Sequence, residues 1–129
     1  MRIENNIKFI GVLLIALLII LSIAGCSGGS SSEKFGVDIT EKKVVEVKDI
    51  FTNPNKYLNQ TFKLEGEIVR ECPSGCWFFL EDKTGTIFVD INPSGLIIPQ
   101  RVGGKVVVEG ELKKIDGRVV FVGKGVEIK

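Results

Sequence analysis

The sequence predicts an all-β domain behind an apolar N-terminal leader, on three observations. The first 25 of the 129 residues include 17 apolar ones. The other 104 residues contain 14 valines against five leucines and neither alanine nor methionine, a composition that favours strands over helices. These 104 residues also hold 15 basic and 15 acidic side chains, and this neutral balance argues against a strongly basic nucleic-acid clamp.

The leader carries no charge from Phe9 to Ala24, and Arg2 and Lys8 precede this apolar stretch. As a helix, this apolar stretch would be about 24 Å long, which is shorter than the ~30 Å hydrocarbon core of a bilayer. A secretory signal peptide therefore fits the leader better than a permanent membrane span.

The leader ends in Ile23-Ala24-Gly25-Cys26, which resembles the lipobox of prokaryotic lipoproteins at all four positions. The resemblance implies that residues 1–25 are a signal peptide, that a lipid is attached through the sulfur of Cys26, and that the mature protein carries palmitate. The domain would then face the extracytoplasmic side of the cell membrane, anchored by that lipid. The alternative is an uncleaved signal anchor in which Cys26 is a chance cysteine.

The residues after Cys26 predict a tether. Ser27–Ser32 is polar and has no apolar side chain to bury, which is typical of flexible linkers. Residues 33–40 then lead into the domain. We therefore expect residues 26–40 to form the lipidated cysteine and its tether, and residues 41–129 to form the folded domain.

The domain begins with a segment whose type the pattern leaves open, since residues 44–52 fit either a short helix or the start of a strand. Residues 53–55 (Asn-Pro-Asn) should interrupt it, because proline disfavours helix in the residue before it and asparagine favours turns. Tyr57 and Leu58 are expected to close one end of the domain.

Alternation of apolar and polar residues predicts three strands in the middle of the domain. The first begins at Thr61, the second covers residues 76–82 and the third covers residues 86–91. The turn at residues 82–85 joins the last two into a hairpin. The residues expected to point inward are Phe62, Leu64, Gly66, Ile68, Phe78, Leu80, Ile87, Val89 and Ile91.

The C-terminal part predicts two more strands after a long connection. Residues 92–104 are rich in proline, glycine and serine, with room for one helical turn. Alternation resumes over residues 105–113, and Asp116-Gly117 is a strong hairpin turn into a strand over residues 118–122. The residues expected to point inward on the first of these strands are Val106, Val108, Gly110 and Leu112.

Five short strands with the longest connection between the third and fourth fit an OB-fold barrel. The segments Leu64–Ile68 (LEGEI), Trp77–Asp82 (WFFLED) and Val106–Gly110 (VVVEG) resemble the anticodon-binding type of OB domain and its relatives among small exported prokaryotic proteins. The resemblance covers residues 44–128 and implies a five-stranded closed barrel. OB domains bind oligonucleotides, sugars, peptides and proteins, so the resemblance does not select a ligand.

The outer face of the predicted hairpin carries an aromatic cluster. With Phe78 in the core, strand parity turns Trp77 and Phe79 outward, and Phe88 faces the same way. Aromatic side chains there form the customary ligand platform of OB domains, and Arg70 could add positive charge beside them. The alternative is that the long connection or the segment before residue 53 covers these rings as a second small core.

Acidic side chains on the same outer face make it a poor surface for phosphate, so nucleic acid is the disfavoured ligand. These acids are Glu65, Glu67, Glu81 and Asp90.

Cys72 and Cys76 lie four positions apart around a Pro-Ser-Gly loop, and outside the cytoplasm we expect them to form a disulfide. The alternative is a redox or metal-handling pair. With no histidine in the chain, histidine metal sites and triads of the Ser-His-Asp type are excluded, and two thiolates alone are an incomplete metal site.

Together these features predict a lipid-anchored extracytoplasmic OB-fold binding module with no catalytic residues, no cofactor and no metal. Its ligand would be an unidentified protein, peptide or saccharide. Two alternatives remain open: a thiol redox or metal-handling protein centred on Cys72 and Cys76, and a structural subunit that docks a membrane partner.

Overall fold

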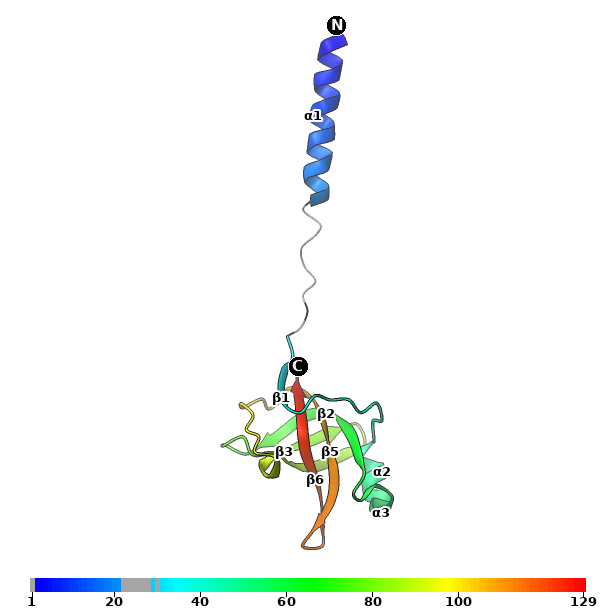
Figure 1. The fold of residues 1–129 in the computed structure, drawn as a ribbon, viewed down its shortest axis with the longest axis vertical. Coiled ribbons are helices and arrows are strands. Elements are labelled where there is room, and N and C mark those ends of the chain that lie inside the picture. The colour runs from blue at the N-terminus through cyan, green and yellow to red at the C-terminus, as the bar shows by residue number, and fades with distance from the viewer. Residues whose placement is uncertain (1, 22–28, 30) are drawn as a thin grey trace. The chain divides into compact units, whose positions relative to one another are not determined.

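The structure is a computed structural model that describes residues 2–21, 29 and 31–129 (Figure 1). The chain divides into two compact units, Met1–Ser30 and Ser31–Lys129. The first contains the helix α1 (Arg2–Leu21). Among the helices that the structure describes, none is long and apolar enough to cross a membrane. Cys26 and the other lipobox residues lie outside the described residues.

The second unit confirms the all-β prediction. Its strands are β1 (Glu33–Gly36), β2 (Thr61–Glu71), β3 (Trp77–Asp82), β4 (Gly85–Asp90), β5 (Lys105–Ile115) and β6 (Arg118–Ile128). The short helices are α2 (Val47–Thr52), α3 (Pro54–Tyr57) and the 3₁₀ turn η1 (Asn92–Ser94).

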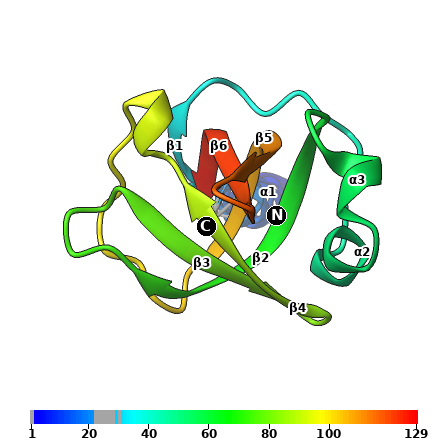
Figure 2. The ribbon, with the colours of Figure 1, turned by 90° about the horizontal axis from the view of Figure 1, so that it is seen from below.

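The strands pair in the order β1-β6-β4-β3-β2-β5, and β5 also pairs with β6. Five strands, β2 to β6, therefore close into a ring, as Figure 2 shows, and β1 pairs with β6 outside it. Neighbours in the ring are antiparallel except β4 and β6, which run parallel and pair only at Val89 with Phe121 and at Asp90 with Val122.

The interior of the ring holds the side chains that alternation predicted. The largest that are fully buried include Phe62, Phe78 and Phe121. Tyr57 is 7% exposed and packs edge-on against Phe62, with ring centroids 5.6 Å apart, so it closes one end of the core as expected. The other predicted inward residues that are buried are Leu64, Ile68, Leu80, Ile87, Val89, Ile91, Val106, Val108, Gly110 and Leu112, whereas Gly66 is only half-buried.

The ends of the domain differ from the sequence-based expectation. Residues 33–36, expected to lead into the domain, form β1, and β6 continues to Ile128 rather than ending at residue 122. The segment left open at residues 44–52 is helix α2 over most of its length. Pro54 does not only interrupt that helix but begins the next one, because the first helical position needs no backbone N–H and suits the fixed φ of proline.

Asp82 links helix α2 to the turn between β3 and β4 by hydrogen bonds. Its carboxylate accepts hydrogen bonds from the backbone N–H of Val47 (2.9 Å), from the N–H and hydroxyl of Thr84 (2.7 and 2.6 Å) and from the N–H of Gly85 (3.0 Å). Burial acts to raise the pKa of Asp82, but these hydrogen bonds outweigh it and lower the pKa. The carboxylate is therefore a structural group of the hairpin that carries the aromatic cluster.

Candidate aromatic binding site

Trp77, Phe79 and Phe88 come together on the outer face of β3 and β4, as parity predicted. The ring centroids of Trp77 and Phe79 are 5.8 Å apart, those of Trp77 and Phe88 5.7 Å, and those of Phe79 and Phe88 5.4 Å. Phe79 and Phe88 are direct cross-strand partners. Each ring thus contacts the other two in edge-to-face or tilted geometry, which is favourable for aromatic pairs.

Arg70 lies beside this cluster, where the sequence placed it. The side chain is exposed, and its Cζ lies 5.9 Å from the centroid of the Phe79 ring, within the range of a cation–π contact. A β-bulge between Ile68 and Arg70 sets Arg70 opposite Phe79. The bulge therefore aims the guanidinium at the aromatic face.

The cluster is half-buried, between the open platform and the covered core that the sequence left as alternatives. Phe79 and Phe88 line a pocket of about 360 Å³ whose other wall is Arg118, Val119 and Val120 at the start of β6. In the covered-core alternative, the long connection or the segment before residue 53 would have covered the rings. The structure places β6 there instead. The aromatic face thus forms one side of a pocket.

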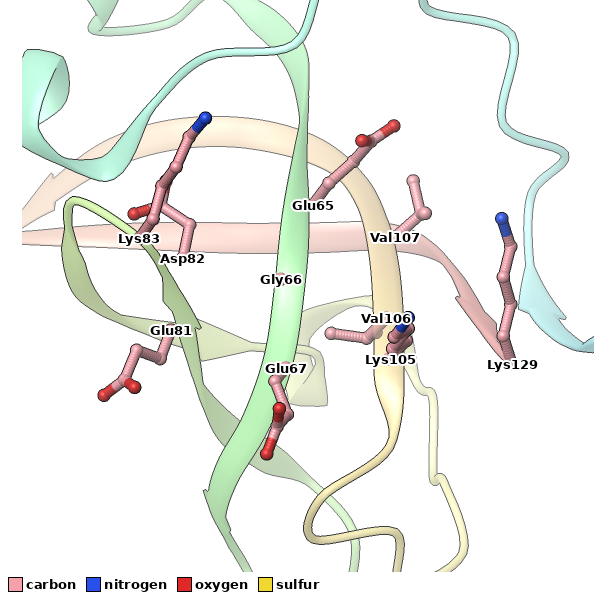
Figure 3. Close-up of a pocket in the computed structure, with 10 residues that line it drawn as sticks. All are labelled: Glu65, Gly66, Glu67, Glu81, Asp82, Lys83, Lys105, Val106, Val107 and Lys129. Atoms are coloured by element: carbon pink, nitrogen blue, oxygen red, sulfur yellow. The ribbon is translucent and has the colours of Figure 1, made fainter.

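A larger pocket, of about 570 Å³, lies elsewhere on the ring and was not predicted (Figure 3). Three of the four acids expected around the aromatic cluster, Glu65, Glu67 and Glu81, line it. So do Lys83, Lys105 and Lys129, so its charge is mixed. The fourth acid, Asp90, is the cross-strand partner of Trp77. None of these four acids lines the aromatic pocket, whose one charged residue is Arg118.

The larger pocket has a topological origin that the sequence pattern does not reveal. Strand β2 pairs with β5 over Thr61–Glu67 but with β3 only over Glu67–Glu71. The pairing of β2 with β3 therefore ends near Gly66. The two strands still lie close together at this point, because a Cβ at Gly66 would collide with the carbonyl oxygen of Glu81. A partner switch of this kind depends on the register of three strands.

The cysteine loop lies next to the aromatic cluster in the chain. The backbone N–H of Cys72 donates to the carbonyl oxygen of Trp77 (2.9 Å), and the N–H of Ile98 donates to the carbonyl oxygen of Gly75 (3.0 Å). The side-chain amide of Gln100 donates to the carbonyl oxygens of Cys72 (2.8 Å) and Pro73 (3.1 Å). The long connection thus holds the loop at the start of β3.

Cys72 and Cys76 are free thiols in this structure, so the predicted disulfide is not formed in it. Cys76 Sγ lies 2.9 Å from Cys72 Sγ, compared with about 2.05 Å for a disulfide bond. The hydrogen bond from Cys76 lowers the pKa of Cys72 to about 7, whereas burial acts in the opposite direction. The same hydrogen bond raises the pKa of Cys76, and burial adds to that effect.

Comparison with solved structures finds proteins of similar fold. No protein-family model and no curated protein matches the chain. A solved structure described as the hypothetical protein ygiW from E. coli is similar over 80% of this chain and 100% of its own, with 22% identity and a TM-score of 0.51. The likeness is one of fold alone. It supports the all-β architecture and carries no information on ligand or activity.

No metal site accompanies the cysteines in the part of the chain that the structure describes. There, no group of three or more cysteine, aspartate or glutamate side chains is arranged to hold a metal ion.

Proposed function

We propose that this protein is a membrane-anchored lipoprotein whose folded unit is an extracytoplasmic OB-fold binding module without catalytic activity. The lipobox at residues 23–26 and the polar tether after it support the anchor and the outward location. The ring of β2 to β6 supports the OB-fold assignment, because it has five strands with the longest connection between β4 and β5.

The observation that carries the binding function is the aromatic cluster of Trp77, Phe79 and Phe88 beside the pocket that β6 completes. Half-buried rings on the outside of a sheet expose apolar surface that the core does not use. A ligand that covers them would gain burial of apolar surface and, for an aromatic group, a further stabilisation of about 0.5 to 1.5 kcal/mol for each ring pair.

The aromatic face can be tested through the single tryptophan of the chain. In the full chain in lipid nanodiscs, we expect Trp77 emission between that of a wet and a buried indole, and a change in it with a peptide or oligosaccharide ligand. Phe79→Ala should weaken that ligand about 5- to 150-fold. A dT oligonucleotide should leave the emission unchanged at physiological salt, because the domain is neutral.

Phe51→Ala is the matched control, because Phe51 is a phenylalanine of α2 that is 54% exposed and outside the cluster. It should bind the same ligand as the wild type does. The aromatic face would be ruled out as the binding site if no peptide or oligosaccharide changed the Trp77 emission. It would also be ruled out if Phe79→Ala and Phe51→Ala lost the same amount of ligand affinity.

A second candidate function, thiol–disulfide exchange, is favoured by the contact between Cys72 and Cys76. The Cys72 thiolate would attack a partner disulfide, forming a mixed disulfide and releasing one partner thiolate. The Cys76 thiolate would then attack Cys72 Sγ and release the second. The partner disulfide gains two electrons and the pair becomes a disulfide, which is also the oxidised form that the sequence predicts outside the cytoplasm.

The pKa of Cys72 gives this candidate a direct test. In reduced protein at pH 7, iodoacetamide should modify Cys72 faster than Cys76, because about half of Cys72 is thiolate when its pKa is about 7. This order is expected although Cys72 is buried and Cys76 is the more exposed of the two. Cys76→Ala removes the hydrogen bond, so the pKa of Cys72 should rise toward 9.0 and its modification at pH 7 should slow about tenfold. Peptide mass spectrometry measures both rates.

Intact mass before and after reduction provides the companion measurement, since reducing a disulfide in the isolated protein adds two hydrogen atoms. Two results together would contradict the exchange function and leave a structural disulfide. Cys72 and Cys76 of the wild type would be modified at equal rates, and the rate at Cys72 would be unchanged in Cys76→Ala.

A further inference from the structure

The aromatic pocket lies where the ring of strands is most weakly closed. β4 and β6 pair at two positions near the end of β4, whereas Gly85–Phe88 and Arg118–Val120 have no ladder pairing with each other. In Figure 1 the β5–β6 hairpin projects beyond the other strands of the ring. The pocket, lined by Phe79, Phe88 and Arg118–Val120, fills this opening between two strand edges.

The edge of β4 at this opening presents free main-chain groups. The N–H of Ile91 donates to the carbonyl oxygen of Cys76 (3.2 Å). In an antiparallel ladder the main-chain groups of alternate residues face the same neighbour, so those of Val89 and Ile87 also face β3. The main-chain groups of Thr86 and Phe88 therefore point to the opposite edge. No β6 residue pairs with Thr86 in the described ladder, which leaves its N–H and C=O for another chain.

The floor of the site is apolar and has a cation on each side. Arg70, Phe79 and Phe88 are successive cross-strand partners on β2, β3 and β4, and Arg118 lines the far wall of the pocket. Within the described residues neither Arg70 nor Arg118 has an ion-pair partner. Both guanidiniums are therefore available to an anionic group on a ligand that covers the rings.

The lining of the pocket distinguishes between ligand classes. Arg118 provides its only polar side chain, so the hydroxyls of a buried saccharide would find few partners and would lose hydrogen bonds to water. A peptide places an apolar side chain in the pocket and pairs its main chain with the open edge, as in other cases of strand addition. A peptide carboxylate also gives the arginines a bidentate partner.

We infer that the opening between β4 and β6 binds an extended peptide segment that carries a large apolar side chain next to an acidic residue. This assignment rests on the proposed binding function and names the ligand class of the same aromatic face. The apolar side chain lies against Phe79 and Phe88, the main chain pairs with Thr86, and the carboxylate binds Arg118.

A random seven-residue peptide library displayed on phage tests this assignment. The full chain in lipid nanodiscs is the target, and empty nanodiscs remove nonspecific binders. We expect recovered peptides to carry an aromatic or large aliphatic residue within two positions of Asp or Glu. Arg118→Glu should weaken their synthetic versions about tenfold or more, because a charge-assisted hydrogen bond becomes a repulsion.

Lys114→Glu is the matched control, since it makes the same charge change at an exposed residue of the same hairpin that does not line the pocket. It should leave peptide affinity within about twofold. Replacing the acidic residue of the peptide by lysine should restore binding to the Arg118→Glu variant. Peptides without an acidic residue, peptides equally sensitive to both substitutions, or no recovered peptide would each overturn the assignment.

An array of neutral and acidic oligosaccharides, probed with the same protein and its Phe79→Ala variant, separates this inference from the proposed function. Saccharide binding that Phe79→Ala removes, without any peptide ligand, leaves the binding module standing and the peptide assignment wrong. If neither library yields a ligand sensitive to Phe79→Ala, both proposals fail.

Discussion

Gly110→Ala should destabilise the folded unit by about 3 kcal/mol or more, because the added methyl has no space. A Cβ at Gly110 would collide with the carbonyl oxygen of Val122 and lie 3.0 Å from the Cα of Gly123. These are backbone atoms, which cannot rotate away as a flexible side chain can. Urea unfolding followed by Trp77 fluorescence measures the loss.

The effect should extend to the closure of the ring. Val122 is one of only two β6 residues that pair with β4, so moving its peptide group disturbs the shortest ladder in the sheet. Gly117→Ala is the control: its φ of +78° imposes a local cost of about 1 kcal/mol, but nothing lies within 4 Å of the new Cβ. Equal losses for both variants would show that close approach is not what requires glycine at residue 110.

Alternation predicted the core well because each ring strand buries one face. Phe62, Leu64 and Ile68 on β2 are all at most 1% exposed, and the predicted inward residues of β3, β4 and β5 are buried as well. A period of two depends only on neighbouring residues, so it can be recognised without knowing which strands pair.

The second half of β6 could not be predicted, because glycines near the C-terminus resemble a strand end. The outer strand β1 was missed with it, because β1 pairs with that half of β6. Gly123 and Gly125 are needed for close contacts instead. A Cβ at Gly123 would lie 2.8 Å from Ile91 Cγ2, and one at Gly125 would collide with the carbonyl oxygen of Val37. Both contacts join segments far apart in the chain, so local sequence does not record them.

The candidate site was predicted only in part, because local sequence indicates its aromatic side and not the wall that a distant segment provides. Parity alone placed Trp77, Phe79 and Phe88 on one face, and the structure brings their rings into mutual contact. The opposite wall at Arg118–Val120 depends on β4 lying beside β6, a parallel pairing between strands separated by the whole of β5. No local pattern predicts that neighbour, so the pocket was missed although its aromatic side was found.

Cys26→Ser should prevent both lipid attachment and removal of the leader, and should release or mislocalise the domain. The expectation rests on the four matching residues Ile23 to Cys26 and on the polar run that follows them. A serine hydroxyl is a far weaker nucleophile than a thiolate, so it does not replace the cysteine sulfur as the acceptor of lipid. Cell fractionation and intact mass together measure the outcome.

Intact mass gives the sharper distinction, because an uncleaved leader can itself hold the variant at a membrane. Wild-type protein should lack residues 1–25 and carry added lipid mass, whereas Cys26→Ser should retain the leader and carry none. Ser27→Ala, one residue further along, should behave as the wild type. If Cys26→Ser stays membrane-bound and its mass differs from that of the wild type only by the substituted atom, no lipid is attached at Cys26. The uncleaved signal anchor then replaces the lipoprotein assignment.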